Sequence, residues 1–438
     1  MEPITAVIVG AGHRAMTYAS YAKEHPEALK IVGVADPNPI RRKMVAEKYN
    51  LPPENCFSSA EELALRGKIA DAVINGTMDK QHVPTSLPLL EAGYHMLLEK
   101  PFSTNEEEMW ELVRAAKKYN RHVAICHVLR YAPFYAAIRK LVLDGEIGEI
   151  VNIQTTEHVS YHHLAVSFVR GKWNNKQACA SSMLMAKCCH DLDLIMWMKS
   201  GIAPSKVASF GSLSQFKPEK APQGAGKRCL VDCKVEQECL YSARKHYLDE
   251  PDRWGMYVWE LLEDIENPTL EDKERSLKTD NPHGRCVYRC DNDVVDRQSV
   301  IIEFEDGCTI THNMIGGTAR PSRSIHLIGT LGEIQGTLED SKFVVRKIDP
   351  RPGCEYTEEV HDLNVTGDMH GAFGGHGGGD LRLIADFCQF LQGGTPSISS
   401  TTINDSIYGH LVGFRAEEAR LEGKVLSIPK LESMLGEK

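Results

Sequence analysis

The chain begins with a strand–turn–helix segment that narrows the choice of fold more than any other feature. The apolar run at 6–9 is followed at once by Gly10-x-Gly12-x-x-Ala15 and a helix-compatible segment at 16–22. Gly10 permits a tight turn, Gly12 lets a pyrophosphate approach the backbone, and Ala15 lets helix and strand pack closely. The N-terminus of that helix offers free N–H groups to an anion. The segment therefore predicts a dinucleotide-binding Rossmann domain.

The next strand supports the same interpretation. Residues 31–35 form a second apolar run that ends in Asp36, where an acid bonds the adenosine ribose hydroxyls. This favours NAD, although Arg41 and Arg42 nearby would also suit the 2′-phosphate of NADP. The alternative is a glycine-rich turn in an α/β protein that binds no dinucleotide, and the strand ending in Asp36 speaks against it.

Strands and helices keep alternating to about residue 126. The pattern predicts strands at 70–75, 95–98 and 122–126, and helices at 60–66, 82–92 and 105–119, the last capped by Ser103 or Thr104. Such alternation is typical of a doubly wound parallel sheet.

The strand at 95–98 leads directly into Glu99-Lys100-Pro101. A lysine at the carboxyl end of a parallel strand points into the crevice where such sheets bind ligands. Lys100 is therefore a candidate catalytic residue. The alternative is an ion pair with Glu99 at the end of the strand.

These residues resemble the Gfo/Idh/MocA oxidoreductases, which are mostly NAD(P)-dependent enzymes acting on sugars, inositols and related polyols. The resemblance rests on Gly10-x-Gly12 with Arg14, Ala35-Asp36-Pro37, Thr77 with His82, and Glu99-Lys100-Pro101. It implies that Lys100 lies near the nicotinamide and the substrate hydroxyl, and that the peptide before Pro101 is cis. The predicted cofactor contacts are Gly10, Gly12, His13, Arg14, Asp36, Thr77, His82, Glu99 and Lys100.

A second domain is predicted from 127 to 438, after the dinucleotide-binding domain of 1–126. The resemblance implies an α+β domain with an open, mostly antiparallel sheet. The sequence fits this with a helix at 136–143, strand pairs at 299–304 with 308–313 and 324–329 with 332–337, and helices at 380–391 and 404–421.

His190 is the second candidate catalytic residue. His190-Asp191-Leu192-Asp193 resembles the histidine motif of the family, but Ala186 stands where the family has an aspartate four residues upstream. An imidazole suits removal of a hydroxyl proton because its pKa lies near the working pH. Lys100 would act either as a base whose pKa burial or Lys187 lowers, or as a charged donor to the substrate oxygen. A buried core histidine is the alternative for His190.

Several polar and aromatic residues of the second domain have the character of a sugar site, where a flat ring packs on C–H groups and donors bind hydroxyls. The predicted substrate contacts are Arg130, His163, Arg170, Trp173, Lys187, Asp191 and His376. His376 lies in a glycine-rich loop before a helix expected to be capped by Asp380, and this loop is either a substrate contact or a linker. The histidines at 158, 162 and 163 have no recognised metal-ligand spacing, so no metal is predicted there.

An insertion near 217–296 contains five cysteines in an unusual spacing: Cys229, Cys233, Cys239, Cys286 and Cys290. Free thiols are the default expectation, and four of the five converging on zinc or an iron–sulfur cluster is the alternative.

Composition excludes other classes of protein. The net charge of −10 argues against a nucleic-acid partner, and no window is apolar enough to span a membrane. The absence of a signal-peptide pattern and the thirteen cysteines favour a cytoplasmic protein with reduced thiols. The resemblance also implies a homo-oligomer, a dimer or tetramer.

Three functions follow from these observations. The first is an NAD(P)-dependent dehydrogenase that transfers hydride from a secondary carbinol of a sugar, glycoside or cyclitol. The second is an NAD-dependent enzyme that cleaves a glycoside by oxidation, elimination and re-reduction. The third, which rests only on Ala186 in place of the aspartate, is a non-enzymatic NAD-binding regulator.

Overall fold

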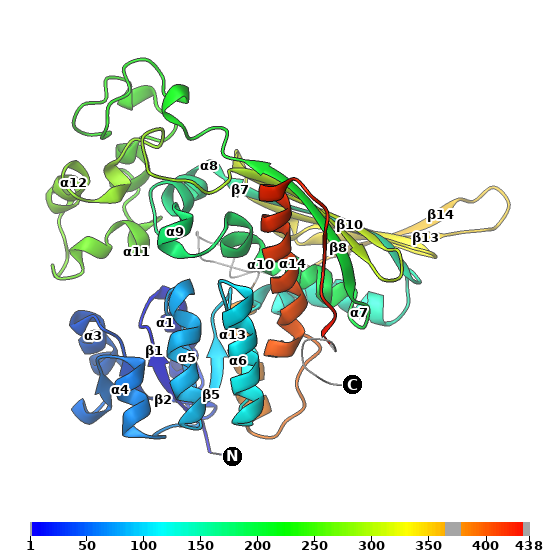
Figure 1. Cartoon of the computed structure of the whole chain (residues 1–438), viewed down its shortest axis with the longest axis horizontal. Helices are drawn as coiled ribbons and strands as arrows, with labels where there is room; N and C mark the ends of the chain where they lie inside the picture. Colours follow the sequence, from blue (N-terminus) through cyan, green and yellow to red (C-terminus); the bar gives the residue numbers. More distant parts are fainter. Residues whose placement is uncertain (1, 364–377, 432–438) are drawn as a thin grey trace.

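A computed structural model describes residues 2–363 and 378–431 and places two sheets side by side (Figure 1). The first is parallel, with the strand order β3-β2-β1-β4-β5-β6. Its strands are β1 (Ile4–Val9), β2 (Leu29–Ala35), β3 (Cys56–Phe57), β4 (Ala72–Asn75), β5 (His95–Leu98) and β6 (Val123–Ile125). Its helices are α1 (His13–Ala19), α2 (Tyr21–Glu24), α3 (Pro39–Tyr49), α4 (Ala60–Arg66), α5 (His82–Glu91) and α6 (Glu106–Lys118). The predicted doubly wound Rossmann sheet is confirmed.

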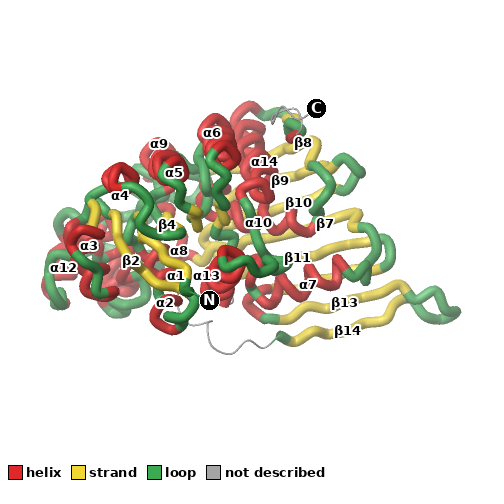
Figure 2. The backbone as a smooth tube through the Cα atoms, turned by 90° about the horizontal axis from the view of Figure 1, so that it is seen from below, coloured by secondary structure: helices red, strands yellow, loops and turns green. Residues whose placement is uncertain are grey.

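The second sheet has nine strands in the order β14-β13-β12-β11-β7-β10-β9-β8-β15 and extends away from the first (Figure 2). Its strands are β7 (Ile150–Ser160), β8 (Pro204–Ser212), β9 (Arg297–Phe304), β10 (Thr309–Thr318), β11 (Ser322–Gly329), β12 (Gly332–Thr337), β13 (Lys342–Ile348), β14 (Tyr356–Asp362) and β15 (Leu426–Ser427). The pair β7–β10 is parallel and the other neighbours are antiparallel. The predicted mostly antiparallel sheet is confirmed, and so are both predicted strand pairs.

Helices of the second domain connect the two sheets. They are α7 (Pro133–Leu143), α8 (Tyr161–Leu164), α9 (Lys176–Cys179), α10 (Met183–Met198), α11 (Gly255–Val258), α12 (Leu270–Lys278), α13 (Gly379–Leu391) and α14 (Ile403–Glu422). The helix α10 is buried along almost its whole length and packs against α14 and β7, while α13 packs beside α1. This placement puts the first turn of α10 close to the end of β5.

Two predicted helix caps are wrong. The N-cap of α6 is Asn105, whose side chain accepts the backbone N–H of Glu108 at 2.9 Å, rather than Ser103 or Thr104. The N-cap of α13 is Gly378, and Asp380 lies inside the helix. Its carboxylate instead accepts a hydrogen bond from Arg14 of α1 at 2.6 Å, because that long-range ion pair outweighs a local cap.

The insertion folds into short helices and turns, part of it around a small apolar cluster shared with Val166, while Tyr241 and Val287 join the main core. Figure 1 shows α11 and α12 of this insertion on the same side of the molecule as α3. Arg41 of α3 pairs with Glu263 of the insertion at 2.6 Å, so the insertion contacts the dinucleotide domain directly. In the residues described, no helix is long and apolar enough to cross a membrane.

Candidate active site

A cavity of about 800 Å³ lies between the two domains. It is lined by all nine residues predicted to contact the cofactor, together with three of the predicted substrate contacts: Gly10, Gly12, His13, Arg14, Asp36, Thr77, His82, Glu99, Lys100, His163, Trp173 and Lys187. The carboxyl ends of the parallel strands open into it, which is where an open α/β sheet binds its ligand.

The turn after β1 has the geometry that a pyrophosphate requires. Gly10 has a φ of +74°, and a Cβ there would lie 2.8 Å from the backbone of Thr77. A Cβ on Gly12 would meet only the Gly76 carbonyl oxygen, at 3.9 Å, so the space above Gly12 stays open to a ligand. The first glycine is therefore needed for the turn, and the second for the close approach.

Asp36 is held rigidly at the end of β2. One carboxylate oxygen accepts the backbone N–H of Ala11 at 2.7 Å, and the other accepts that of Asn38 at 2.7 Å. Arg41, the residue suited to a 2′-phosphate, donates from Nε and Nη2 to the Glu263 carboxylate at 2.9 and 2.6 Å. Its positive charge is thus already paired, and this arrangement favours a free ribose hydroxyl over a phosphate.

We predict that Glu263→Ala raises the ratio of kcat/KM with NADP to kcat/KM with NAD by roughly tenfold. Removing Glu263 leaves Arg41 only the longer contact with Glu260 at 3.6 Å, and a hydrogen bond to a charged group is worth about 1.5–3 kcal/mol. Initial rates with each cofactor measure the ratio, and Glu266→Ala, an exposed acid of the same insertion, is the control. An unchanged ratio in Glu263→Ala would show that this ion pair does not select the cofactor.

Lys100 follows β5 and joins Pro101 through a cis peptide bond, as the resemblance implied. Its Nζ donates to the backbone carbonyl of Ala186 in the first turn of α10 at 3.1 Å. Lys100 therefore contacts the backbone carbonyl of Ala186, at the position where the family has an aspartate side chain.

Glu99 is held by two side chains of α1. It accepts hydrogen bonds from Arg14 Nε at 2.9 Å and from the Tyr18 hydroxyl at 2.7 Å. Burial acts to raise the pKa of Glu99, but Arg14 and Lys100 outweigh it and hold that pKa below its usual value. Glu99 is thus an ionised group that fixes α1 against the end of β5.

His190 is buried on α10, one turn beyond Ala186, and does not line the described cavity. Its ring centroid lies 5.7 Å from that of His127, which follows β6. Burial lowers the pKa of His127, with Arg130 and Lys100 adding to the effect, so His127 is neutral. His190 therefore stands behind the cavity wall that Lys100 and Lys187 form.

Of the other predicted substrate contacts, one lines the cavity and two are buried away from it. Trp173 lines the cavity and its indole N–H donates to Asp79 at 3.2 Å. Arg130 is buried away from the cavity and pairs with Asp193 at 2.6 Å, and Arg170 is buried against the insertion. His376 lies outside the described residues.

A buried chain of ion pairs runs from the cavity wall into the second sheet. Lys187 Nζ lies 3.2 Å from Glu157, Glu157 lies 2.6 Å from Arg323 Nε, and Arg323 Nε lies 3.2 Å from Asp191. Burial lowers the pKa of Lys187, although Glu157 opposes the shift, and burial raises the pKa of Asp191 to about 7. The predicted contact Asp191 thus belongs to this network rather than to the cavity lining.

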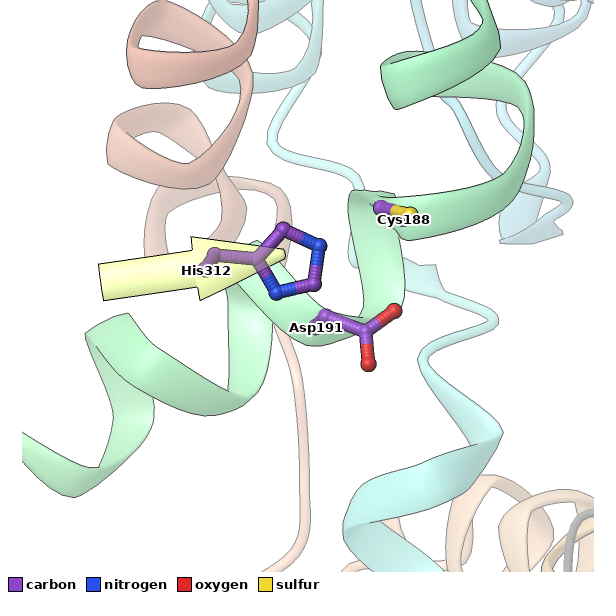
Figure 3. A group of neighbouring side chains, drawn as sticks. All are labelled: Cys188, Asp191 and His312. Atoms are coloured by element: carbon purple, nitrogen blue, oxygen red, sulfur yellow. The ribbon is translucent and has the colours of Figure 1, made fainter. Parts of the chain in front are cut away.

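Cys188, Asp191 and His312 converge beside this network from α10 and β10 (Figure 3). Their ligand atoms all lie within 4.8 Å of one another, and all three residues are buried. His312 Nδ1 is 2.9 Å from the Thr155 hydroxyl. The guanidinium of Arg323 already supplies the positive charge next to Asp191, so the cluster forms part of the ion-pair network.

We predict that the protein loses stability in acid because three of its histidines are buried. Burial lowers the pKa of His312 to about 4, and those of His283 and His410 to about 3. An unfolded histidine takes up its proton near pH 6.5, so the unfolded state binds more protons as the pH falls below that value. Each histidine then costs about 1.4 kcal/mol of stability per pH unit. Urea unfolding at pH 7.0 and 5.5 measures the loss, His410→Gln should reduce it, and equal stability at both values would contradict the prediction.

Sequence reasoning missed the contribution of the insertion. Met256, Tyr257, Glu260 and Glu263 line the cavity opposite the dinucleotide domain. It also missed Asp79, which accepts hydrogen bonds from Trp173 and from the Ser181 hydroxyl at 2.8 Å. The insertion lacks a regular hydrophobic period, so no pattern in it predicted contact with the cofactor groove.

Comparison with known proteins agrees with this geometry. The family model described as an oxidoreductase family with an NAD-binding Rossmann fold matches residues 4–127, and the model for its C-terminal alpha/beta domain matches residues 139–425. The oxidoreductase YteT of Bacillus subtilis (strain 168) is 25% identical over 368 residues, which cover 82% of this chain and 81% of YteT. Inositol 2-dehydrogenase of Corynebacterium glutamicum (strain R) is 26% identical over 53% of this chain, which spans 64% of that relative.

Solved structures share the fold over almost the whole chain. Levoglucosan dehydrogenase in complex with NADH and L-sorbose has a TM-score of 0.68 at 17% identity and covers 98% of this chain and 100% of its own. An oxidoreductase from Agrobacterium radiobacter in complex with NAD+, L-tartaric acid and magnesium has a TM-score of 0.68 at 12% identity and covers 97% of this chain and 98% of its own.

The fold, the cavity and these matches define an NAD(P)-dependent oxidoreductase of the class that acts on CH–OH groups, with NAD as its cofactor. The chain belongs to the Gfo/Idh/MocA family of oxidoreductases.

Proposed function

We propose that the enzyme oxidises a secondary carbinol of a sugar, glycoside or cyclitol. The observation that carries this proposal is the position of Lys100, which stands at the carboxyl end of β5 in the same cavity as the dinucleotide turn, His163 and Trp173. An aromatic face beside cationic and imidazole donors suits a polyhydroxylated substrate. Inositol 2-dehydrogenase among the relatives supports this substrate class.

The residues of the chain divide the work of the reaction. NAD supplies the hydride acceptor when it is bound, with Gly12 and Asp36 as the residues that would hold its pyrophosphate and ribose. Lys100, anchored on the Ala186 carbonyl, binds the substrate hydroxyl. As a neutral amine it accepts the hydroxyl proton, and as an ammonium it stabilises the negative charge that the proton leaves on the oxygen. Lys187 stands at the same wall, where its amino group pairs with Glu157 at 3.2 Å and can donate a further hydrogen bond to the substrate.

His190 is proposed as a positioning residue behind this wall. It lies one helical turn beyond Ala186, whose carbonyl accepts the Lys100 ammonium, and next to the neutral His127. Its role in the reaction is therefore indirect, through the placement of α10 and Lys100. Among the remaining predicted contacts, we propose that His163, Trp173 and Lys187 bind substrate.

A panel assay tests the substrate class. Incubating the protein with NAD and a set of sugars, glycosides and cyclitols should produce NADH, followed by absorbance, with at least one member. Polyols without a ring serve as the comparison set. No NADH with any compound, while NAD binding is measurable, would contradict net oxidation.

Glycoside cleavage through oxidation, elimination and re-reduction is the second candidate. One observation favours it: Met256 and Tyr257 of the insertion line the cavity over the cofactor groove. Such a cover would keep the cofactor bound from the oxidation step to the re-reduction step. Release of the aglycone without accumulation of NADH would distinguish this reaction from net oxidation. The homo-oligomer that the resemblance implies stays a prediction.

A further inference from the structure

Four of the five cysteines of the insertion surround one small cavity. Cys229, Cys233, Cys239 and Cys286 line a space of about 10 Å³ that lies apart from the cofactor cavity. This is room for a single water-sized sphere. Cys290 does not line it.

Backbone pairing brings the two cysteine-bearing segments together. An isolated antiparallel bridge joins Arg228 to Arg285. The Cys286 N–H donates to the Lys227 carbonyl at 2.9 Å, and the Cys229 N–H donates to the Gly284 carbonyl at 2.9 Å. The four thiols therefore face one space from two segments that this backbone pairing joins.

Hydrogen-bond donors point at two of these sulfurs. The Tyr241 N–H donates to Cys239 Sγ at 3.3 Å. Arg170 Nη2 lies 3.3 Å from Cys229 Sγ. A neutral thiol is a weak acceptor, whereas donors directed at sulfur stabilise the thiolates of metal centres.

Arg170 is built into this arrangement. Its side chain is almost fully buried and also donates to the carbonyls of Tyr241 at 2.8 Å and Arg285 at 2.7 Å. It thereby ties both cysteine segments together and places a positive charge beside the sulfurs. This charge offsets part of the negative charge of several thiolates in one site.

Part of the insertion packs away from the main core. Tyr241, Val287, Val294 and Val295 join that core, whereas a small separate cluster is formed with Val166 by Cys229, Ala243, Tyr247, Leu248, Trp254, Val258 and Leu277. Loop-rich segments with so small a core are usually held by disulfides or a metal. All thirteen cysteines of the chain are free thiols, so disulfides do not provide this link.

We propose that Cys229, Cys233, Cys239 and Cys286 hold a structural metal centre through their thiolates, and that this centre fixes the insertion over the cofactor cavity. The segment between Cys239 and Cys286 carries Tyr257 and Glu263, which line that cavity. The metal site is thus separate from catalysis but shapes the binding of NAD.

The four sulfurs are not at the distances of an occupied metal site. In the described part of the chain, no three of them all lie within 4.8 Å of one another. A tetrahedral zinc site with Zn–S bonds of about 2.3 Å has sulfurs about 3.8 Å apart, and an iron–sulfur cluster, also held by four cysteine thiolates, is larger than the present space. Binding of either group therefore shifts the four sulfurs from these positions.

Metal analysis of the full chain, purified without oxygen, tests the proposal. We expect about four iron atoms per chain with a visible absorption band for a cluster, or about one zinc without the band. Either result supports a thiolate-bound centre, and the metal found identifies which kind of centre it is. Protein that holds neither metal, even after reconstitution with zinc or with iron and sulfide, would overturn it.

Two cysteines of the same segment provide a matched pair of variants. Cys286→Ser should lower the metal content at least fivefold and weaken NAD binding, whereas Cys290→Ser should keep both. Cys290 is the control because its Sγ instead donates to the Cys286 carbonyl at 3.3 Å. Equal metal loss in both variants would contradict the assignment.

A second measurement covers the case in which Cys286→Ser does not fold. Native wild-type protein is treated with iodoacetamide, and each cysteine is assayed by mass spectrometry before and after removal of metal with a chelator. The four cavity cysteines should become reactive together only after the chelator, while the exposed Cys354 reacts throughout. Unchanged labelling of the four would overturn the proposal.

Discussion

Lys100→Met should lower kcat/KM for the best carbinol substrate by about 10²–10⁴-fold, the range over which a positioned acid–base group acts. The ammonium is the group that enters the cavity at the end of β5, and its removal leaves the substrate oxygen without that charge. Affinity for NAD should change little, because the dinucleotide turn and Asp36 are untouched. Initial rates and a separate binding titration with NAD measure the two effects.

Lys30→Met is the matched control for this variant. Lys30 is an exposed lysine of β2 in the same domain, and neither it nor its sequence neighbours line the cavity, so its loss removes the same charge at a distance from the cavity lining. Rates within about threefold of wild type are expected for an exposed surface change of this kind. Wild-type activity in Lys100→Met would exclude Lys100 from the reaction.

The cofactor half of the molecule was predictable because its chemistry is local. The turn at Gly10 and Gly12 and the acid at Asp36 follow from the spacing of glycines and strands, and the structure places them on one cavity. A strand, a tight turn and a helix within twenty or so residues leave the chain few alternatives. The resemblance to the family added Lys100 and its cis peptide bond.

The substrate contacts were less predictable, because a charged residue that forms a buried ion pair and one that binds substrate cannot be told apart in the sequence. Arg130 and Arg170 had the character of substrate contacts, but both are buried away from the main cavity and satisfied by partners far along the chain. Glu263 meets Arg41 across more than two hundred positions of sequence, and no local pattern predicts such a contact.

One signal in the strands was available. Arg323 shares the inward face of β11 with the buried Ile325 and Leu327, because side chains alternate along a strand. Glu157 occupies an inward position of β7 in the same way. A charged residue in the apolar register of a strand predicts a buried ion pair, and two such residues on neighbouring strands predict each other as partners.

Arg323→Met should destabilise the protein by about 3–5 kcal/mol, the usual cost of breaking a buried ion pair from one side. Arg323 lies between Glu157, at 2.6 Å, and Asp191, at 3.2 Å, and without it Lys187 is left to face both carboxylates. Urea unfolding at pH 7.5 measures the change. Because Lys187 lines the cavity, the variant should also raise the KM of the carbinol substrate.

Arg346→Met separates the effect of burial from that of charge. Arg346 pairs with Glu333 at 3.1 Å and Glu358 at 2.8 Å on the same sheet, but at its solvent-exposed side. An exposed pair contributes at most about 1 kcal/mol because water screens it and already solvates its partners. Equal losses in both variants would show that the network around Arg323 is no more costly to break than a surface ion pair. A larger loss of unfolding free energy in Arg323→Met, as expected, would show that the buried charges of β7, β11 and α10 stabilise the cavity wall.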